Sequence, residues 1–126
     1  MPLVQLEVLK GQPTLRKKAL FDAVHEALVE AFQIPDDDRV QRLVEHDGDD
    51  FDVPSQSFTI VTITMFPGRS LGAKRRLYRT IIERFGDIGI PAADVNIVLD
   101  ERPLENWGIR GGQPASDVDL GFDVDV

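Results

Sequence analysis

The sequence predicts an α/β fold in which a β-α-β unit occurs twice in tandem, because two series of turn residues repeat at nearly the same distance. Gly11 corresponds to Gly68, and the Ile-Pro pair at 34–35 corresponds to the pair at 90–91. Parallel strands joined by one helix need a right-handed crossover, so two adjacent units place both helices on one face. We therefore expect a four-stranded, mostly parallel or mixed sheet with two helices on one face.

The first unit is expected to run strand, helix, strand. Residues 3–9 are rich in Val and Leu and precede a turn, which favours a buried strand. Thr14 is a candidate N-cap, and apolar residues at three- and four-residue spacings predict an amphipathic helix over residues 15–32. Alternation over residues 39–44 predicts the second strand.

The second unit repeats this order. Residues 58–66 are dense in β-branched and aromatic side chains and predict a strand. Ser70 is a candidate cap for the following helix, which Gly86 and Gly89 are expected to end. Residues 95–99 predict the last strand.

The chain of 126 residues fits one domain, with pseudo-repeats of about residues 1–57 and 58–126. No third helix remains to cover the second face of the sheet, which is expected to be apolar, so a further copy of the chain is the expected cover. The tail, residues 107–126, contains four glycines and ends in an alternating run over residues 118–126, and it is expected to form a turn or hairpin that reaches a neighbouring subunit.

Charge and composition limit the classes of partner that the chain is expected to bind. With 14 basic and 22 acidic residues, the net charge of −8 disfavours nucleic acid and anionic membrane surfaces. The absence of cysteine fits a reducing cytosol, and no apolar run approaches a membrane span, so a cytoplasmic protein is expected. The acidic segment 45–57 lacks the central glycine and closing glutamate of an EF-hand, so a solvated loop without metal is expected.

Pro2 gives the amino end its chemical interest. If Met1 is removed, the Pro2 nitrogen becomes a secondary amine, and an α-amino group titrates near about 7.7–8.0. That range suits a general acid or base. In the structural alternative, Pro2 begins an edge strand, where its missing N–H does little harm.

Four motifs in order carry a family resemblance: Pro2 at the first strand, and the segments 35–39, 68–70 and 106–112. On the duplicated pattern they resemble the tautomerase superfamily, most closely its malonate semialdehyde decarboxylase-like group, over nearly the whole chain. The resemblance implies a homotrimer of duplicated subunits with an active site around each Pro2. Thr59 corresponds to Pro2 in the second unit and cannot have a free nitrogen, so one site per subunit is expected.

The same resemblance implies roles for charged residues. It places Asp38 near Pro2, although Asp94 holds the equivalent position and a capping role is the alternative. Arg69 follows a glycine at a helix start, where it can receive a carboxylate, or it is a solvated surface residue. Phe66 or Pro67 stands where the decarboxylase pattern has a second arginine. Arg39 is a candidate substitute, or a salt-bridged surface group.

The apolar and histidine residues have competing interpretations. The resemblance makes Trp107 and Ile109, with Phe66, an apolar wall for substrate, whereas core or interface packing explains Trp107 equally well. His25 is expected on a helix surface and His46 in the acidic loop.

These residues lead to three functional hypotheses. The first is a cofactor-independent keto–enol tautomerase of small 2-oxo acids, in which Pro2 moves the proton and Arg69 holds the carboxylate. The second is decarboxylation or hydration of a 3-oxo acid such as malonate semialdehyde, with Pro2 as the acid and Asp38 orienting water or substrate. The third is a trimeric scaffold without catalysis. None of them uses a cofactor or metal.

Overall fold

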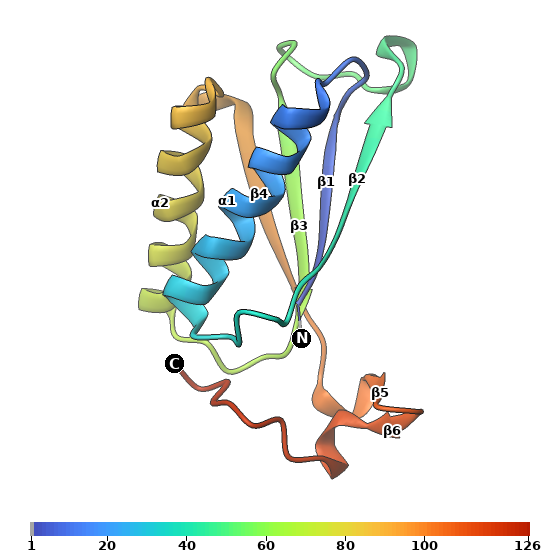
Figure 1. The fold of residues 1–126 in the computed structure, drawn as a ribbon, viewed down its shortest axis with the longest axis vertical. Coiled ribbons are helices and arrows are strands. Elements are labelled where there is room, and N and C mark those ends of the chain that lie inside the picture. Colours follow the sequence, from blue (N-terminus) through green and yellow to red (C-terminus); the bar gives the residue numbers. More distant parts are fainter. Residues whose placement is uncertain (1) are drawn as a thin grey trace.

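The computed structural model describes residues 2–126, and the expected removal of Met1 lies outside the described residues. Its main sheet has the strand order β2-β1-β3-β4 (Figure 1). The strands are β1 (Leu3–Leu9), β2 (Val40–His46), β3 (Thr59–Met65) and β4 (Val95–Glu101). Each unit contributes one parallel pair, and the central strands β1 and β3 are antiparallel. The sheet is therefore mixed, and the duplicated β-α-β fold is confirmed.

The two helices, α1 (Thr14–Phe32) and α2 (Leu71–Ile88), lie side by side on one face of the sheet (Figure 1). Alternate residues of the central strands point toward them, and the pair Leu6 and Val61 is fully buried. The helices contribute Leu28, Leu77 and other apolar residues to the same core. Each fully buried large apolar side chain stabilises the fold by about 1.5–3 kcal/mol.

The helix ends differ in part from expectation. Ser70 caps α2 as predicted, since its Oγ accepts a hydrogen bond from the Ala73 N–H at 3.1 Å. The Thr14 prediction is wrong, because Pro13 occupies the N-cap and Thr14 is already helical. Gly86 does not end α2, which continues to Ile88 and stops at Gly89 with φ of 96°. Gly86 keeps helical geometry, whereas Gly89 supplies the left-handed C-cap.

The face of the sheet away from the helices is more polar than predicted. Cross-strand pairs lie on it: the Arg42 Nε donates to Gln5 Oε1 at 2.9 Å, and His46 Nε2 lies 3.1 Å from Glu7 Oε1. His46 thus belongs to β2 rather than to the acidic loop. Apolar side chains such as Val98, 51% exposed, stand among these polar groups. The predicted apolar face is therefore a mixed one.

The chain after β4 returns to the same end of the molecule at which β1 begins (Figure 1). A small hairpin joins β5 (Gly108–Ile109) and β6 (Gln113–Pro114). This is the hairpin predicted for the tail; residues 118–126 form no strand and extend back to the turn before α2, where the Ser70 N–H donates to the Val126 oxygen at 2.8 Å. The connections contain 3-10 turns η1 (Gly48–Asp50), η2 (Ala92–Asp94), η3 (Leu104–Asn106) and η4 (Ala115–Asp117).

Within residues 2–126, no helix combines the length and apolar character needed to cross a membrane.

Candidate active site

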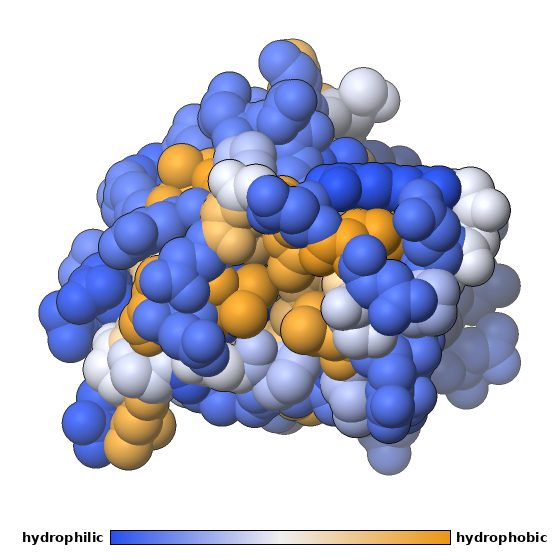
Figure 2. All heavy atoms as spheres, turned by 90° about the horizontal axis from the view of Figure 1, so that it is seen from below, coloured by the Kyte–Doolittle hydropathy of each residue, from blue (hydrophilic) through white to orange (hydrophobic). Residues whose placement is uncertain are grey.

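A cavity of about 430 Å³ opens at the end of the sheet where β1 and β2 begin. We call it the main cavity; the residues that line it are Pro35, Asp37, Asp38, Arg39, Val40, Phe66, Ile109, Arg110, Leu120 and Phe122. Figure 2 views this end from below, with hydrophobic side chains gathered in the centre and hydrophilic ones around them. The site thus combines an apolar wall with two aspartates and two arginines on its polar side.

Pro2 lies buried beside this cavity. It lines a tight recess, the Pro2 recess, together with Val4, His25, Leu28, Asp38, Arg39, Val40 and Gln41. The edge-strand interpretation of Pro2 is wrong, because β1 lies between β2 and β3 inside the sheet. A proline just before a central strand costs no ladder hydrogen bond, so the position is compatible with both folding and chemistry.

Asp38 and Arg39 belong to both surfaces, lining the Pro2 recess and the main cavity. They sit on the turn between α1 and β2, where the Asp38 N–H donates to the Pro35 carbonyl at 3.0 Å. Asp94, the equivalent residue of the second unit, accepts a hydrogen bond from Ser57 Oγ at 2.5 Å. The two aspartates therefore share a position in the repeat but have different neighbours.

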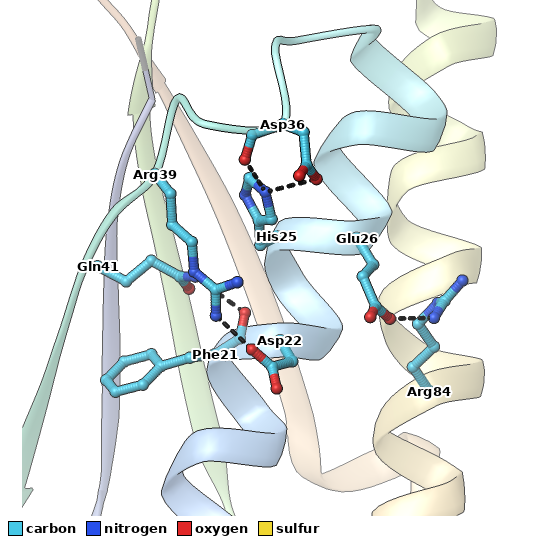
Figure 3. Close-up of polar contacts among 8 residues, drawn as sticks. All are labelled: Phe21, Asp22, His25, Glu26, Asp36, Arg39, Gln41 and Arg84. Carbon is cyan, nitrogen blue, oxygen red and sulfur yellow. Dashed lines mark hydrogen bonds and ion pairs between the residues drawn. The ribbon is translucent and has the colours of Figure 1, made fainter.

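Helix α1 holds the turn that carries Asp38 through several polar contacts (Figure 3). The His25 Nε2 lies 2.8 Å from the Asp36 carbonyl oxygen and 3.5 Å from the Asp36 carboxylate. Arg39 forms an ion pair with Asp22, and its hydrogen bond holds the pKa of that carboxyl below its usual range. The salt-bridged alternative for Arg39 describes this contact, although the residue also lines the cavity.

His25 is the functional-site neighbour that sequence reasoning missed. We predicted a surface histidine, but its side chain is only 4% exposed. It directly follows the core residue Val24, and so lies on the flank of the apolar stripe that faces β2. The sequence signal for the burial of His25 was this position next to the apolar stripe. Its burial also depends on how the 36–41 segment packs, and the helix pattern alone does not predict that packing.

Arg69 is buried, at 7% exposure, so the solvated-surface interpretation is wrong. Its Nη1 donates to the Phe66 carbonyl at 3.1 Å, and its guanidinium lies 5.0 Å from the centroid of the Phe32 ring. Burial lowers the pKa of Arg69, while nearby carboxylates, Glu101 foremost, oppose the shift. Its Nε has no hydrogen-bond partner within residues 2–126, and Arg69 is not among the residues that line the main cavity.

The amino end of α2, expected to help bind a carboxylate, is in contact with the chain's own last residues. Besides the Ser70–Val126 hydrogen bond, Gly68 lies so close to this segment that a Cβ atom there would meet Asp125 Oδ1 at 2.5 Å. Residues 124–126 thus occupy the approach to this helix end.

The three predicted apolar residues fall on two surfaces. Phe66 and Ile109 line the main cavity, whereas Trp107 faces a separate hollow beside Leu3 and Thr64. Trp107 packs edge-on against Phe66, with ring centroids 4.9 Å apart, and supports the wall from behind. Leu120 and Phe122 complete the wall; their alternation within residues 118–126 was the only signal for them.

Within residues 2–126, no three His, Asp or Glu side chains gather as a candidate metal site.

Comparison with known proteins decides the family. A family model described as tautomerase enzyme matches residues 38–110, and a second model with the same description matches residues 2–58. The chain belongs to the tautomerase family. The resemblance inferred from the sequence is thereby confirmed.

Relatives and solved structures agree with this family. The chain is 25% identical to the probable tautomerase YrdN of Bacillus subtilis (strain 168), over 90% of this chain and 94% of that protein. It is 30% identical to FG41 malonate semialdehyde decarboxylase inhibited by 3-bromopropiolate, with a TM-score of 0.82 over 89% of this chain and 92% of that one. A wild-type fused 4-OT, solved as a symmetric trimer, shares the fold at 23% identity, with a TM-score of 0.81 over 90% and 96% of the two chains.

Proposed function

We propose that this tautomerase-family chain is a cofactor-independent keto–enol tautomerase of small 2-oxo acids, with the Pro2 nitrogen as its base. The observation that carries this proposal is the position of Pro2 in a buried recess whose residues Asp38, Arg39 and Val40 also line the main cavity. A substrate in that cavity would lie next to the amino end of the chain. The proposal requires removal of Met1, since an amide nitrogen has no basic lone pair.

The proposed reaction moves one proton between carbon and oxygen. In the keto-to-enol direction, the Pro2 nitrogen takes a proton from the carbon next to the carbonyl. The C–H electron pair becomes the C=C bond, and the carbonyl π electrons move onto the oxygen. That oxygen takes the proton from the protonated Pro2, which returns to its neutral form. Burial lowers the pKa of an amine, whereas a nearby carboxylate such as Asp38 raises it, so these opposing effects set the proton affinity of Pro2.

The carboxylate of the substrate needs a cationic partner, and three arginines are candidates. We propose Arg69 because its buried Nε is a donor with no partner within residues 2–126, and a buried unpaired donor favours a ligand. Arg39 and Arg110 are the alternatives because they line the main cavity directly. Arg110 donates to the Asp119 carbonyl at 2.6 Å, which leaves its charge without a carboxylate partner among the described residues.

Separate glutamine variants of Arg69, Arg39 and Arg110 distinguish these anchors. Loss of the true carboxylate partner should raise KM by about 10- to 100-fold, the cost of a charged hydrogen bond of 1.5–3 kcal/mol. If Arg69→Gln leaves KM unchanged while another variant raises it, the anchor is reassigned.

The apolar wall favours a hydrophobic group on the substrate. Phe66 and Ile109 line the main cavity, and Leu120 and Phe122 close it from the C-terminal segment. Aromatic or alkenyl 2-oxo acids suit such a lining because they bury apolar surface while the carboxylate meets an arginine.

Decarboxylation or hydration of a 3-oxo acid is the second candidate. It draws support from the 30% identity to a malonate semialdehyde decarboxylase and from the carboxylate of Asp38 in the Pro2 recess, which favours a protonated amine. Against it, Phe66 or Pro67 stands where the resemblance implies a second arginine in that group.

A homotrimer is the assembly that we propose. The similarity in fold to a trimeric fused 4-OT supports it, as does the sheet face that no helix covers. Light scattering of the purified protein tests this assembly, since a monomer at micromolar concentration would contradict it.

The deciding experiment begins with the intact mass of the protein produced in a cell. A mass without Met1 is required for either enzymatic function. That protein is then given a panel of enolised aryl 2-oxo acids and of 3-oxo acids. Turnover of the 2-oxo acids supports the tautomerase, release of carbon dioxide from 3-oxo acids alone replaces it with the second candidate, and no turnover by the processed chain leaves the scaffold.

A further inference from the structure

We propose that His25 is a positioning residue that holds the turn between α1 and β2, and with it Asp38, against the Pro2 recess. For its effect on turnover, this inference rests on the proposed function; its effect on the turn itself does not.

The burial of His25 is the first argument. Its side chain is 4% exposed and lines the Pro2 recess with Pro2 and Asp38. A polar ring buried at such a place must be hydrogen-bonded to offset the loss of water. Because the Asp36 carbonyl can only accept, the His25 Nε2 carries a proton and donates to it at 2.8 Å. The bond therefore joins a core position of α1 to the backbone of the turn.

The second argument is where this bond acts. Asp36 stands two residues before Asp38, and its own side chain is 97% exposed, so it has no packed side chain to hold it. Next to it, the Asp38 N–H bonds to the Pro35 carbonyl within the turn. The His25 hydrogen bond thus fixes the backbone at Asp36, on the exposed side of the turn. Asp38 of the candidate site lies on the other side of the same turn.

The neighbouring contacts show that α1 holds this segment at successive points. Arg39 pairs with Asp22, and the Gln41 Nε2 donates to the Phe21 carbonyl at 2.9 Å (Figure 3). Asp22 and Arg39 are each 39% exposed and compete with water, whereas His25 is the buried contact of the series. We therefore expect His25 to contribute most to the order of the turn.

Three variants test this role. His25→Leu keeps an apolar group of similar size but removes the donor, and His25→Gln returns an amide N–H near the position of Nε2. Glu26→Gln is the matched control: Glu26 is the next residue of α1 but points to the other side, where it pairs with Arg84 of α2 (Figure 3). Amide hydrogen exchange of residues 36–39, melting temperature and the kinetics on an enolised 2-oxo acid are measured for each.

His25→Leu should speed amide exchange at Asp38 and lower kcat by about 10- to 100-fold, as misplacement near a reacting atom does, with little change in KM. His25→Gln should restore both to within about threefold, the range of ordinary context effects. Glu26→Gln should change neither the exchange nor kcat, and it should cost little melting temperature because its ion pair is exposed.

Unchanged exchange of residues 36–39 in His25→Leu would overturn the proposal, whatever the kinetics. Faster exchange with unchanged kcat would also overturn it, since the turn would then not serve the reaction. If the wild-type protein has no turnover, the proposed function fails by itself. Amide exchange at Asp38 still decides whether His25 orders the turn: it should be faster in His25→Leu and restored in His25→Gln. If His25→Leu does not fold, His25→Asn replaces it, because a shorter side chain also loses the contact to Asp36.

Discussion

The two β-α-β units fold alike but differ where strand, turn and helix meet. In the first unit, Pro2 precedes β1, and the turn after α1 carries Asp38 and is bonded to His25. In the second unit, Thr59 stands at the place of Pro2, fully buried, with its hydroxyl donating to the Ser57 carbonyl at 3.0 Å. Helix α2 has Ile82 at the position where α1 has His25.

This difference distinguishes the residues that the fold requires from the residues that only the candidate site requires. The second unit shows that a β-α-β crossover packs with an apolar residue at the position of His25, as Ile82 is partly buried against the core. The first unit instead buries a histidine and a proline beside two charged residues, a costly choice unless it is offset. Polar groups kept at such a cost are typical of functional sites, which is why we place the chemistry in the first unit.

The largest expected effect on kcat comes from replacing Pro2, which has Thr59 as its counterpart in the second unit. Pro2→Ala should lower kcat for an enolised 2-oxo acid by about 10²- to 10⁴-fold, the usual contribution of a positioned acid or base. Thr59→Val, at the equivalent place, should leave kcat within about threefold, although it loses a buried hydrogen bond of roughly 1 kcal/mol. Steady-state kinetics of both variants measure this. Equal losses would mean that Pro2 is structural.

The paired aspartates provide the next comparison. Asp38→Asn should reduce kcat/KM by about 10- to 100-fold by removing a charge next to Pro2, with a shifted pH–rate profile. Asp94→Asn should instead lower the melting temperature, because Asp94 accepts a short hydrogen bond from Ser57. Kinetics together with thermal melts distinguish the two. A loss of activity in Asp94→Asn equal to that of Asp38→Asn would contradict the division of roles.

The paired glycines should separate the two turns by stability. Gly11 and Gly68 both have positive φ, 109° and 121°, so alanine at either costs roughly 1–2 kcal/mol of backbone strain. Space for a Cβ is open at Gly11, whereas Asp125 and Val124 crowd it at Gly68. Gly68→Ala should therefore reduce the free energy of unfolding more than Gly11→Ala in urea melts. Equal losses would show that residues 124–126 do not pack on this turn.

Much of this asymmetry is invisible to periodicity. The repeat, the mixed sheet and the two helices follow from local patterns, since alternation and three- or four-residue spacings are set by strand and helix geometry. The burial of His25 and Arg69 does not follow from local patterns, because it depends on other segments of the chain. The 36–41 segment covers His25, and the Arg69 guanidinium lies over the Phe32 ring. The Leu120 and Phe122 wall was missed because those residues form no regular element.

The smallest effect concerns acid stability of the first unit. The Arg39 hydrogen bond lowers the pKa of Asp22 from its ordinary value of 3.8, so the charged form is favoured in the folded state. Its contribution is present above that value and disappears as pH falls through the lower folded pKa. At 39% exposure, the pair should contribute at most about 1 kcal/mol. The difference in melting temperature between wild type and Asp22→Asn should therefore shrink as pH falls below 3.8. A constant difference would exclude this linkage.

The ionisation of the Pro2 nitrogen tests the central claim most directly. The measurement is ¹⁵N NMR of processed protein labelled at proline, followed across pH. A base at rest must be neutral, so the proposed function predicts that the Pro2 amine is neutral at pH 7, although an ordinary α-amino group titrates near about 7.7–8.0. A nitrogen that stays protonated well above pH 8 would contradict the tautomerase with Pro2 as base and favour acid chemistry on a 3-oxo acid.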